Sequence, residues 1–293
     1  MKKSLSVLLL VFTLITGLIV SGCSKESPDN KKSEASQNGN ETKKEVVLKV
    51  GASPVPHSEL LNLVKDDLKE QGIILEIKEF NDYVQPNIAL NDKQLDANFF
   101  QHKPYLDEFI EAKGVDLVSL GQVHVEPLGL YSESIKSLDE LKDGATIAIP
   151  NDPTNGGRAL LLLQNQGLIK LKENAGLTAT SNDIDKNPKK LKFEELDAAQ
   201  IPRTLKDVDA AVINGNFALD AGLVPTKDAL TVSKDKKDDL VLEGKESPYA
   251  NIIAVRKGEE NNENLKALLK ALQSDKVKKY IEENYKGGVV PAF

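Results

Sequence analysis

The sequence is poor in the side chains on which many metal and redox sites depend. Its 293 residues include one Cys, no Trp, three His and a single Met, the initiator. One Cys excludes an intramolecular disulfide and any multi-cysteine zinc or iron–sulfur site. The histidines form no HExxH motif, so we expect no metal-dependent hydrolase and predict neither a bound metal nor a cofactor.

The chain also lacks an excess of basic charge. It has 38 Lys+Arg against 45 Asp+Glu, which gives a net charge of -7. Affinity for phosphate backbones depends on clustered Lys and Arg, so we expect no nucleic-acid partner. The 40% hydrophobic and 28% charged residues are typical of a globular protein that buries a core.

Common catalytic motifs are absent as well: the sequence contains no GxSxG, no GxGxxG and no Walker A motif. We therefore expect a protein that is not an enzyme. The enzymatic alternative is a hydrolase that uses His102 with Asp107 or His57. It lacks a neighbouring Ser or Cys nucleophile.

The N-terminus has the pattern of an export signal. Lys2 and Lys3 precede an uncharged, largely apolar run over residues 4–20, and small residues then lead to the only cysteine, Cys23. This pattern predicts a signal peptide over residues 1–22; an uncleaved membrane anchor with an incidental cysteine is the alternative. The sequence Val-Ser-Gly-Cys at 20–23 resembles a bacterial lipobox, in which the cysteine carries lipid.

Residues 23–45 are expected to form a lipidated cysteine and a disordered tether. Ala35 is the only aliphatic side chain between residues 24 and 45, so this stretch has too little apolar surface to fold by burial. Its lysines are roughly balanced by acids. We therefore expect attachment to the extracytoplasmic face of the cell membrane through lipid rather than through charge.

Beyond residue 45, strand patterns alternate with helix patterns. Strands are expected at 46–50, 73–80, 95–100, 145–150, 191–196, 210–213 and 252–255. Helices are expected after Ser58, Pro86 and Pro104, after the capping box at 137–140, at 160–163 and as a terminal helix at 265–272. The alternation predicts an α/β protein of two lobes, with parallel sheets, helices on both faces and a ligand site beyond the strand ends.

Two groups of residues at expected strand ends are candidates for that site. Phe100, His102 and Tyr105, with Tyr83 after another strand, suggest an aromatic pocket; the alternative is that the phenylalanines are core residues and His102 caps a helix. Arg158 follows the motif NDPTNGG and is one of three arginines in a lysine-rich chain. Its planar guanidinium suits a carboxylate, with phosphate or a surface ion pair as alternatives.

Two asparagines, Asn214 and Asn251, also lie at expected strand ends. Their amides offer the donors and the acceptor that an amino acid's carboxylate and amino groups need, although turn residues are an alternative interpretation.

Together, FQHKPYLD at 100–107, PNDPTN at 150–155, AVIN at 211–214, ESPYAN at 246–251 and NDYV at 81–84 resemble the methionine-binding lipoproteins of bacterial ABC importers, the NlpA lipoprotein family. The resemblance implies a type II periplasmic-binding-protein fold with two crossover strands as hinge, near residues 122–131 and 246–253. Lobe 1 would comprise 46–125 plus 251–293, and lobe 2 would comprise 126–250.

The resemblance also implies roles for the candidate residues. Arg158 would hold the ligand carboxylate, and Asn214 and Asn251 would hold the carboxylate and amino groups. Four ring-bearing residues would surround the thioether side chain: Tyr83, Phe100, His102 and Tyr105. His57 would line the mouth of the pocket. The expected partners of this monomer are L-methionine or D-methionine, an ABC permease and its ATPase.

Two alternatives to this function stay open. Gly156 and Gly157 precede Arg158 where family members often carry bulkier residues, which suggests extra room for a methionine-containing dipeptide such as Gly-Met. A surface interaction lipoprotein is the other alternative.

Overall fold

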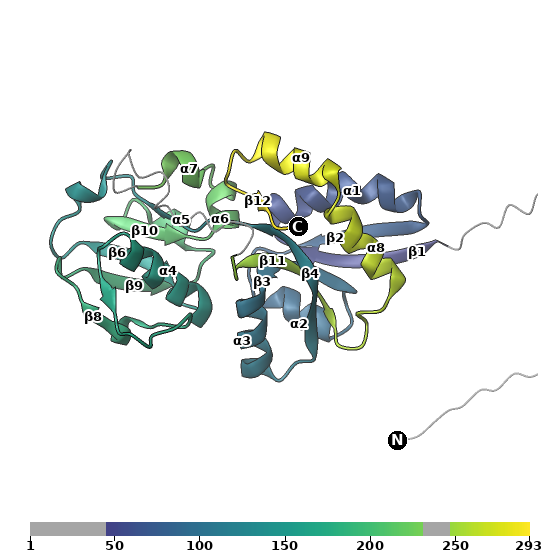
Figure 1. Cartoon of the computed structure of the whole chain (residues 1–293), viewed down its shortest axis with the longest axis horizontal. Helices are drawn as coiled ribbons and strands as arrows, with labels where there is room; N and C mark the ends of the chain where they lie inside the picture. The colour runs from purple at the N-terminus through teal and green to yellow at the C-terminus, as the bar shows by residue number, and fades with distance from the viewer. Residues whose placement is uncertain (1–44, 231–246) are drawn as a thin grey trace, which may run out of the picture. The chain divides into compact units, whose positions relative to one another are not determined.

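The computed structural model describes residues 45–230 and 247–293. The expected signal peptide, Cys23 and almost all of the tether lie outside these residues. Two β-sheets organise the described part of the chain (Figure 1). The larger has six strands in the order β12-β4-β11-β3-β1-β2, and the smaller has four in the order β5-β10-β6-β9.

The six-stranded sheet is built from both ends of the described chain. Its strands are β1 (Val46–Ala52), β2 (Ile73–Glu79), β3 (Ala97–His102), β4 (Leu117–Val125), β11 (Ala250–Arg256) and β12 (Val290–Pro291). Its helices are α1 (Glu59–Lys69), α2 (Gln85–Asn91), α3 (Lys103–Lys113), α8 (Glu263–Leu272) and α9 (Asp275–Asn284), with a short turn η1 (Pro54–Ser58) before α1. We call this part lobe 1.

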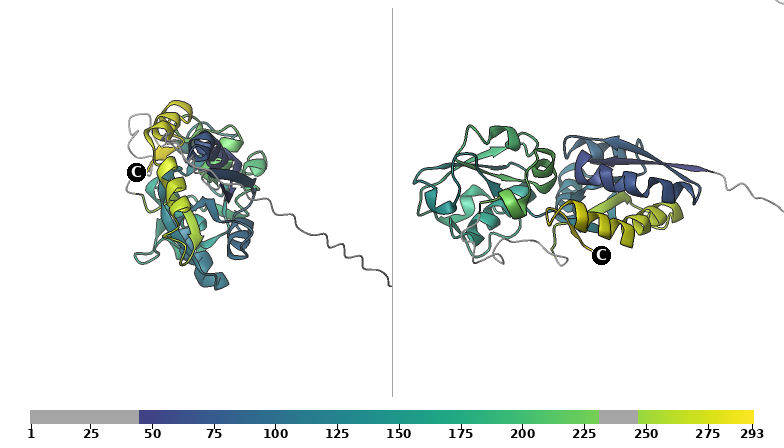
Figure 2. Two further views of the ribbon diagram at one scale, coloured as in Figure 1. Left: turned by 90° about the vertical axis from the view of Figure 1, so that its right-hand side faces the viewer. Right: turned by 90° about the horizontal axis from the view of Figure 1, so that it is seen from above.

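The helices of lobe 1 cover both faces of its sheet. Helix α1 buries Leu60, Leu61, Val64 and Leu68, a spacing that places them on one side of the helix. They share a core with apolar residues of α8 and α9, and Figure 2 shows these three helices side by side in the view from above. A second core on the opposite face contains Leu90 of α2 and Leu106 of α3.

The four-stranded sheet forms lobe 2. Its strands are β5 (Gly129–Tyr131), β6 (Thr146–Pro150), β9 (Lys192–Leu196) and β10 (Ala210–Ile213). The other elements are α4 (Pro153–Asn165), α5 (Ile201–Thr204), α6 (Gly215–Asp220), α7 (Pro225–Asp228), the 3-10 turns η2 (Leu138–Glu140) and η3 (Ser181–Asp183), and a small sheet of β7 (Lys170–Leu171) and β8 (Ile184–Lys186). Strand β6 alternates, with Ile147 and Ile149 in one core and Ala148 in another, so both faces of the sheet are buried.

The chain passes between the two sheets twice. It leaves lobe 1 at the end of β4 and enters lobe 2 at β5, and it returns through Ser247–Tyr249 into β11. This is a two-lobed, periplasmic-binding-protein-like fold. In residues 45–230 and 247–293 no helix is both long and apolar enough to cross a membrane.

The sheets are mixed, whereas the sequence pattern predicted parallel ones. Strand β1 pairs in parallel with β2 and β3, but β11 runs antiparallel to both of its neighbours, β3 and β4. Strand β5 is likewise antiparallel to β10. Strands β5 and β11 each follow a passage between lobes, where no crossover helix sets the strand direction; β12, after α9, is also antiparallel to β4.

Three local expectations were wrong. Ser58 does not cap α1, because η1 has already wound the chain and Ser58 adopts helical angles; its hydroxyl donates to Glu79 Oε1 at 2.7 Å. The capping box at Ser137 precedes only the 3-10 turn η2, without a side-chain cap. Helix α8 is not the terminal helix, since Ser274 starts α9 by accepting a hydrogen bond from the Val277 amide.

Candidate ligand-binding site

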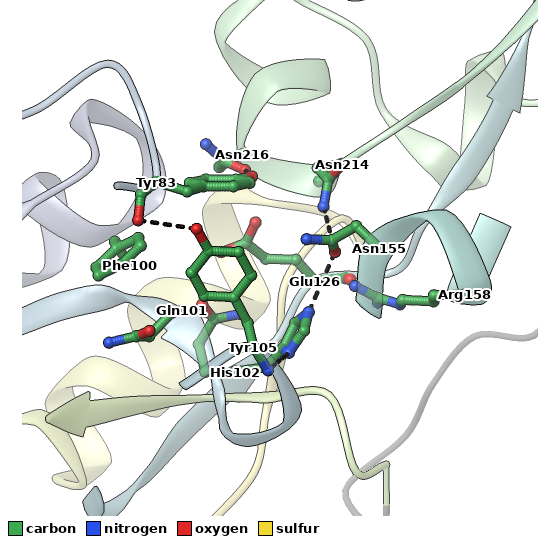
Figure 3. Close-up of a pocket in the computed structure, with 12 residues that line it drawn as sticks. Tyr83, Phe100, Gln101, His102, Tyr105, Glu126, Asn155, Arg158, Asn214 and Asn216 are labelled. Atoms are coloured by element: carbon green, nitrogen blue, oxygen red, sulfur yellow. Dashed lines mark hydrogen bonds between the residues drawn. The ribbon is translucent and has the colours of Figure 1, made fainter. Parts of the chain in front are cut away.

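One pocket collects most of the residues that the sequence marked as candidates (Figure 3). Its lining residues come from both lobes: Tyr83, Phe100, Gln101, His102, Tyr105, Glu126, Asn155, Arg158, Asn214, Gly215, Asn216 and Asn251. They lie in the last residues of β3, beyond the ends of β2, β3, β4, β6 and β10 or at the start of β11, as expected for a ligand site in α/β sheets.

Three aromatic side chains of lobe 1 form one side of the pocket. The ring centroids of Tyr83, Phe100 and Tyr105 lie 5.7 to 6.2 Å apart, and the Tyr105 ring is edge-on to both of the others. The Tyr105 hydroxyl donates to the Tyr83 carbonyl at 3.1 Å. Tyr83 also reaches across to lobe 2, where its ring lies 5.0 Å from Phe217 and its hydroxyl donates to Asn216 Oδ1 at 2.5 Å.

His102 both caps a helix and lines the pocket, so the two interpretations of its role are compatible. Its Nδ1 accepts a hydrogen bond from the Tyr105 amide at 3.2 Å, which places the ring proton on Nε2. Nε2 can then donate to Asn155 Oδ1 of lobe 2, 3.1 Å away. Burial, and secondly the charge of Arg158, lower the pKa of His102 to about 3, so the ring is neutral.

Arg158 is a buried residue and not a surface ion pair. It lies in α4, which starts after the Asp152 cap, and 5% of its surface is exposed. Its Nη2 donates to the backbone carbonyl of Glu126 at 2.7 Å, and its guanidinium lies 4.4 Å from the centroid of the Tyr249 ring. A buried guanidinium in a pocket is a strong candidate for binding an anionic group.

A network of amides connects the two lobes beside Arg158. Asn155 Oδ1 accepts from Asn214 Nδ2 at 2.8 Å and from His102 Nε2, while Asn155 Nδ2 donates to both carboxylate oxygens of Asp152 at 3.0 Å. Every polar side-chain atom of Asn155 is thereby used within the protein. Asn214 Oδ1 is buried and has no hydrogen-bond partner among the described residues, so it offers an acceptor to a ligand N–H group.

His57 does not lie at the mouth of the pocket, contrary to expectation. It is fully buried behind the lining residues, with Nε2 3.0 Å from Asn251 Oδ1 and 3.2 Å from Glu126 Oε1. It therefore contacts two residues that line the pocket without lining it. His124, which the sequence left without a role, joins the same cluster through its Nε2, 2.8 Å from Glu126 Oε1.

The glycines before Arg158 do not create extra room for a dipeptide. A Cβ on Gly157 would lie 2.2 Å from the Leu177 carbonyl oxygen, and one on Gly156 would lie 2.9 Å from that of Pro150. Glycine is therefore required at both positions, because the backbone packs too closely around α4 to leave space for a Cβ. The argument from these glycines for a larger ligand was wrong.

The structure also separates the residues of the hydrolase alternative. Asp107 forms an ion pair with Lys103 at 2.5 Å, and both side chains are more than half exposed. His102 already uses both ring nitrogens, with Tyr105 and Asn155. No Ser, Thr or Cys is among the described residues that line the pocket.

Sequence reasoning missed several lining residues. Glu126 is the clearest, and its signal was a single acid within an otherwise apolar run in the first crossover. Asn155 lies inside the NDPTNGG motif, from which only Arg158, the residue that follows it, was expected to bind a ligand. Asn216 and Gln101 had no signal beyond their place next to an expected strand end.

The two sheets, the two passages between them and the pocket at their strand ends define a two-lobed ligand-binding protein. A family model for NlpA lipoprotein matches residues 48–293. The chain belongs to the NlpA lipoprotein family.

The chain is similar to several named proteins and solved structures. The D-methionine-binding lipoprotein MetQ of Salmonella typhimurium is 44% identical over 286 residues, covering 97% of this chain and 96% of that protein. A nutrient binding protein from Burkholderia cenocepacia, solved bound to methionine, is 50% identical with a TM-score of 0.77 and covers 84% of this chain and 100% of that one. An ABC transporter periplasmic substrate-binding protein from Coxiella burnetii is 45% identical with a TM-score of 0.76, over 84% and 100% of the two chains.

Proposed function

We propose that this protein is the substrate-binding lipoprotein of an ABC importer and that it binds methionine between its two lobes. The observation that carries the proposal is one pocket with three kinds of group. Arg158 suits a carboxylate, Asn214 Oδ1 is an acceptor for an ammonium, and three aromatic rings face them from lobe 1. The Burkholderia structure contains methionine, and the name of the Salmonella protein includes it.

Each group has a role in this proposal. Arg158 binds the α-carboxylate through charge-assisted hydrogen bonds, and Asn251 adds an amide whose oxygen is oriented by His57. Asn214 Oδ1 accepts from the ammonium. Tyr83, Phe100 and Tyr105 surround the thioether, where each sulfur–aromatic contact contributes about 0.3–1.5 kcal/mol. His102 completes the site at the boundary between the lobes.

Ligand binding is coupled to closure of the two lobes in this mechanism. Because Arg158 and Asn214 belong to lobe 2 and the aromatic residues to lobe 1, a ligand makes all its contacts only in the closed arrangement. Preferential binding to that arrangement shifts the population toward it. The closed form is then the form that a permease and its ATPase receive. Lipid on Cys23 would keep the protein on the extracytoplasmic face of the membrane.

A thermal-stability assay with a small panel of ligands tests the proposal. L-methionine, D-methionine, Gly-Met, norleucine and leucine are each added to the full-length protein at increasing concentration. At 100 times its Kd a ligand stabilises the native state by about 2.7 kcal/mol, which corresponds to a rise in Tm of about 5–11 °C for a domain of this size. We expect that rise with methionine and a smaller one with leucine. No rise with any of the five would favour a surface interaction lipoprotein instead.

A further inference from the structure

A cluster of three buried ionisable residues lies directly behind the pocket. The relative solvent-exposed surfaces of His57, His124 and Glu126 are 0%, 0% and 4%, and these residues lie in η1, in β4 and directly after β4, respectively. Glu126 Oε1 lies 2.8 Å from His124 Nε2 and 3.2 Å from His57 Nε2. Of the three, only Glu126 lines the pocket (Figure 3).

The positions of the protons follow from the hydrogen-bond partners. The Nε2 atom of His57 faces two oxygen acceptors, Asn251 Oδ1 and Glu126 Oε1, and that of His124 faces Glu126 Oε1. An ionised carboxylate only accepts, so both Nε2 atoms carry a proton. Burial lowers the pKa of His57 to about 4 and that of His124 to about 3, so each ring is a neutral N–H donor at neutral pH.

The carboxylate is also restricted on its other side. Gly215 leaves space for it, since a Cβ there would lie 2.5 Å from Glu126 Cβ and 3.0 Å from Glu126 Oε2. A hydrogen bond from the Asn216 backbone amide stabilises the ionised form. Glu126 thus has three donors, from His57, His124 and the Asn216 amide, while its side chain borders the pocket.

We propose that His57 and His124 are positioning residues that keep the Glu126 carboxylate ionised and oriented as the counter-charge for the ligand's α-ammonium. This rests on the proposed binding of an amino acid. The carboxylate and ammonium of an amino acid share one carbon, so their partners must be neighbours. Arg158 and Glu126 are neighbours, because the guanidinium donates to the Glu126 carbonyl at 2.7 Å.

The proposal has a pH dependence with a definite sign. The charged and titratable groups that interact with Glu126 are His57, His124 and Arg158, with Tyr83 and Tyr285 also affected by its charge. Burial raises the pKa of Glu126, so this carboxylate gains a proton at a higher pH than an exposed one. Protonation removes the counter-charge. Affinity for an ammonium-bearing ligand therefore falls as the pH drops through that pKa.

Two ligands that differ only in the ammonium group distinguish the role of Glu126 from the ligand binding of the whole site. L-methionine carries the ammonium, and 4-(methylsulfanyl)butanoate is the same molecule without it. In calorimetry on the full-length protein, Glu126→Gln should weaken L-methionine at least about 30-fold, since truncating one partner of a buried charge pair is costly. The same variant should change affinity for 4-(methylsulfanyl)butanoate less than about threefold. Glu76→Gln, an equal charge change at an exposed position of β2 outside the pocket, should alter neither.

Equal losses for both ligands in Glu126→Gln would overturn the assignment. If the wild-type protein binds neither ligand, the proposed function itself fails, which is a different result. Should Glu126→Gln not fold, the wild-type protein alone decides: between pH 7.5 and pH 5.5, where both ligands keep an ionised carboxylate, L-methionine affinity should fall while that of 4-(methylsulfanyl)butanoate stays level. Parallel curves for the two ligands would refute the proposal.

The histidines are tested by the midpoint of that pH curve. His124→Phe keeps a ring but removes the N–H, so the ionised carboxylate loses a donor and the midpoint should move to higher pH. His124→Gln, whose amide nitrogen can reach the same oxygen, should move it back toward wild type. A uniform loss of affinity at every pH would indicate a purely structural role and contradict the proposal. Loss of binding after chelator treatment would indicate a metal ion in the cluster and would also overturn it.

Discussion

Replacing Arg158 tests the proposed site most directly. The side chain is 5% exposed, donates to the Glu126 carbonyl and stacks on Tyr249. If it also binds the ligand carboxylate, Arg158→Ala removes one partner of a desolvated charge pair. Such truncations cost about 2–5 kcal/mol, which corresponds to about 30- to 4000-fold in Kd. Arg158→Lys keeps the charge but loses the planar fork, so its loss should be smaller.

The effect on the fold should be separable from the effect on binding. Loss of the hydrogen bond to Glu126 and of the contact with Tyr249 lowers the free energy of unfolding by about 1–3 kcal/mol, and each kcal/mol lowers Tm by about 2–4 °C. The variant should therefore remain folded at 25 °C. Arg203→Ala, at an exposed arginine in α5, is the matched control and should bind normally.

Calorimetry with two ligands measures the interaction itself. L-methionine carries a carboxylate and L-methioninol an alcohol at the same position. The wild-type protein should discriminate strongly against methioninol, and Arg158→Ala should lose most of that discrimination. An Arg158→Ala protein that binds L-methionine within threefold of wild type would refute the reasoning, because the guanidinium would then have no part in holding the carboxylate.

Three other changes have defined outcomes. Tyr83→Phe keeps the ring but removes the hydroxyl that donates to Asn216 of the other lobe. The affinity for methionine should fall about 10-fold, which corresponds to ~1.4 kcal/mol. An unchanged calorimetric Kd would contradict a contribution of this hydrogen bond to closure of the lobes. Gly157→Ala places a Cβ against the Leu177 carbonyl and should cost about 1–3 kcal/mol of stability in a denaturant titration, unless the 175–180 segment yields. Cys23→Ala should move the protein from the membrane pellet to the supernatant; continued sedimentation with membranes would argue against a lipid anchor.

Much of the site was predictable because it follows a general property of α/β proteins. Ligand-binding residues lie at the ends of strands. Strand ends can be recognised in the sequence as apolar runs followed by residues that start a helix. Arg158, His102 and Asn214 were found in this way, and the structure brings them together in one pocket. Their unusual residue types, in a chain with few arginines and aromatics, supplied the rest of the signal.

The parts that were not predicted depend on contacts between distant segments. Glu126 lies in a crossover, and its partner His57 comes from a turn 69 positions earlier, so no local pattern connects them. The need for glycine at position 157 in α4 arises from the backbone of Leu177, which lies in a loop 20 positions later. Strand direction in β11 likewise depends on the chain returning from lobe 2, which periodicity within one segment does not encode.

Hydrogen bonds between the lobes, from Tyr83 to Asn216, from His102 to Asn155 and from Thr226 to the Lys286 carbonyl, have a consequence for the proposed transport function. They stabilise the closed arrangement of the lobes whatever molecule occupies the pocket. Part of the apparent affinity for a ligand therefore comes from contacts within the protein itself. Release of the ligand then requires more than weakening the contacts between protein and ligand. If the protein delivers its ligand to an ATP-driven permease, as proposed, part of the energy of ATP must therefore be used to break these contacts between the lobes.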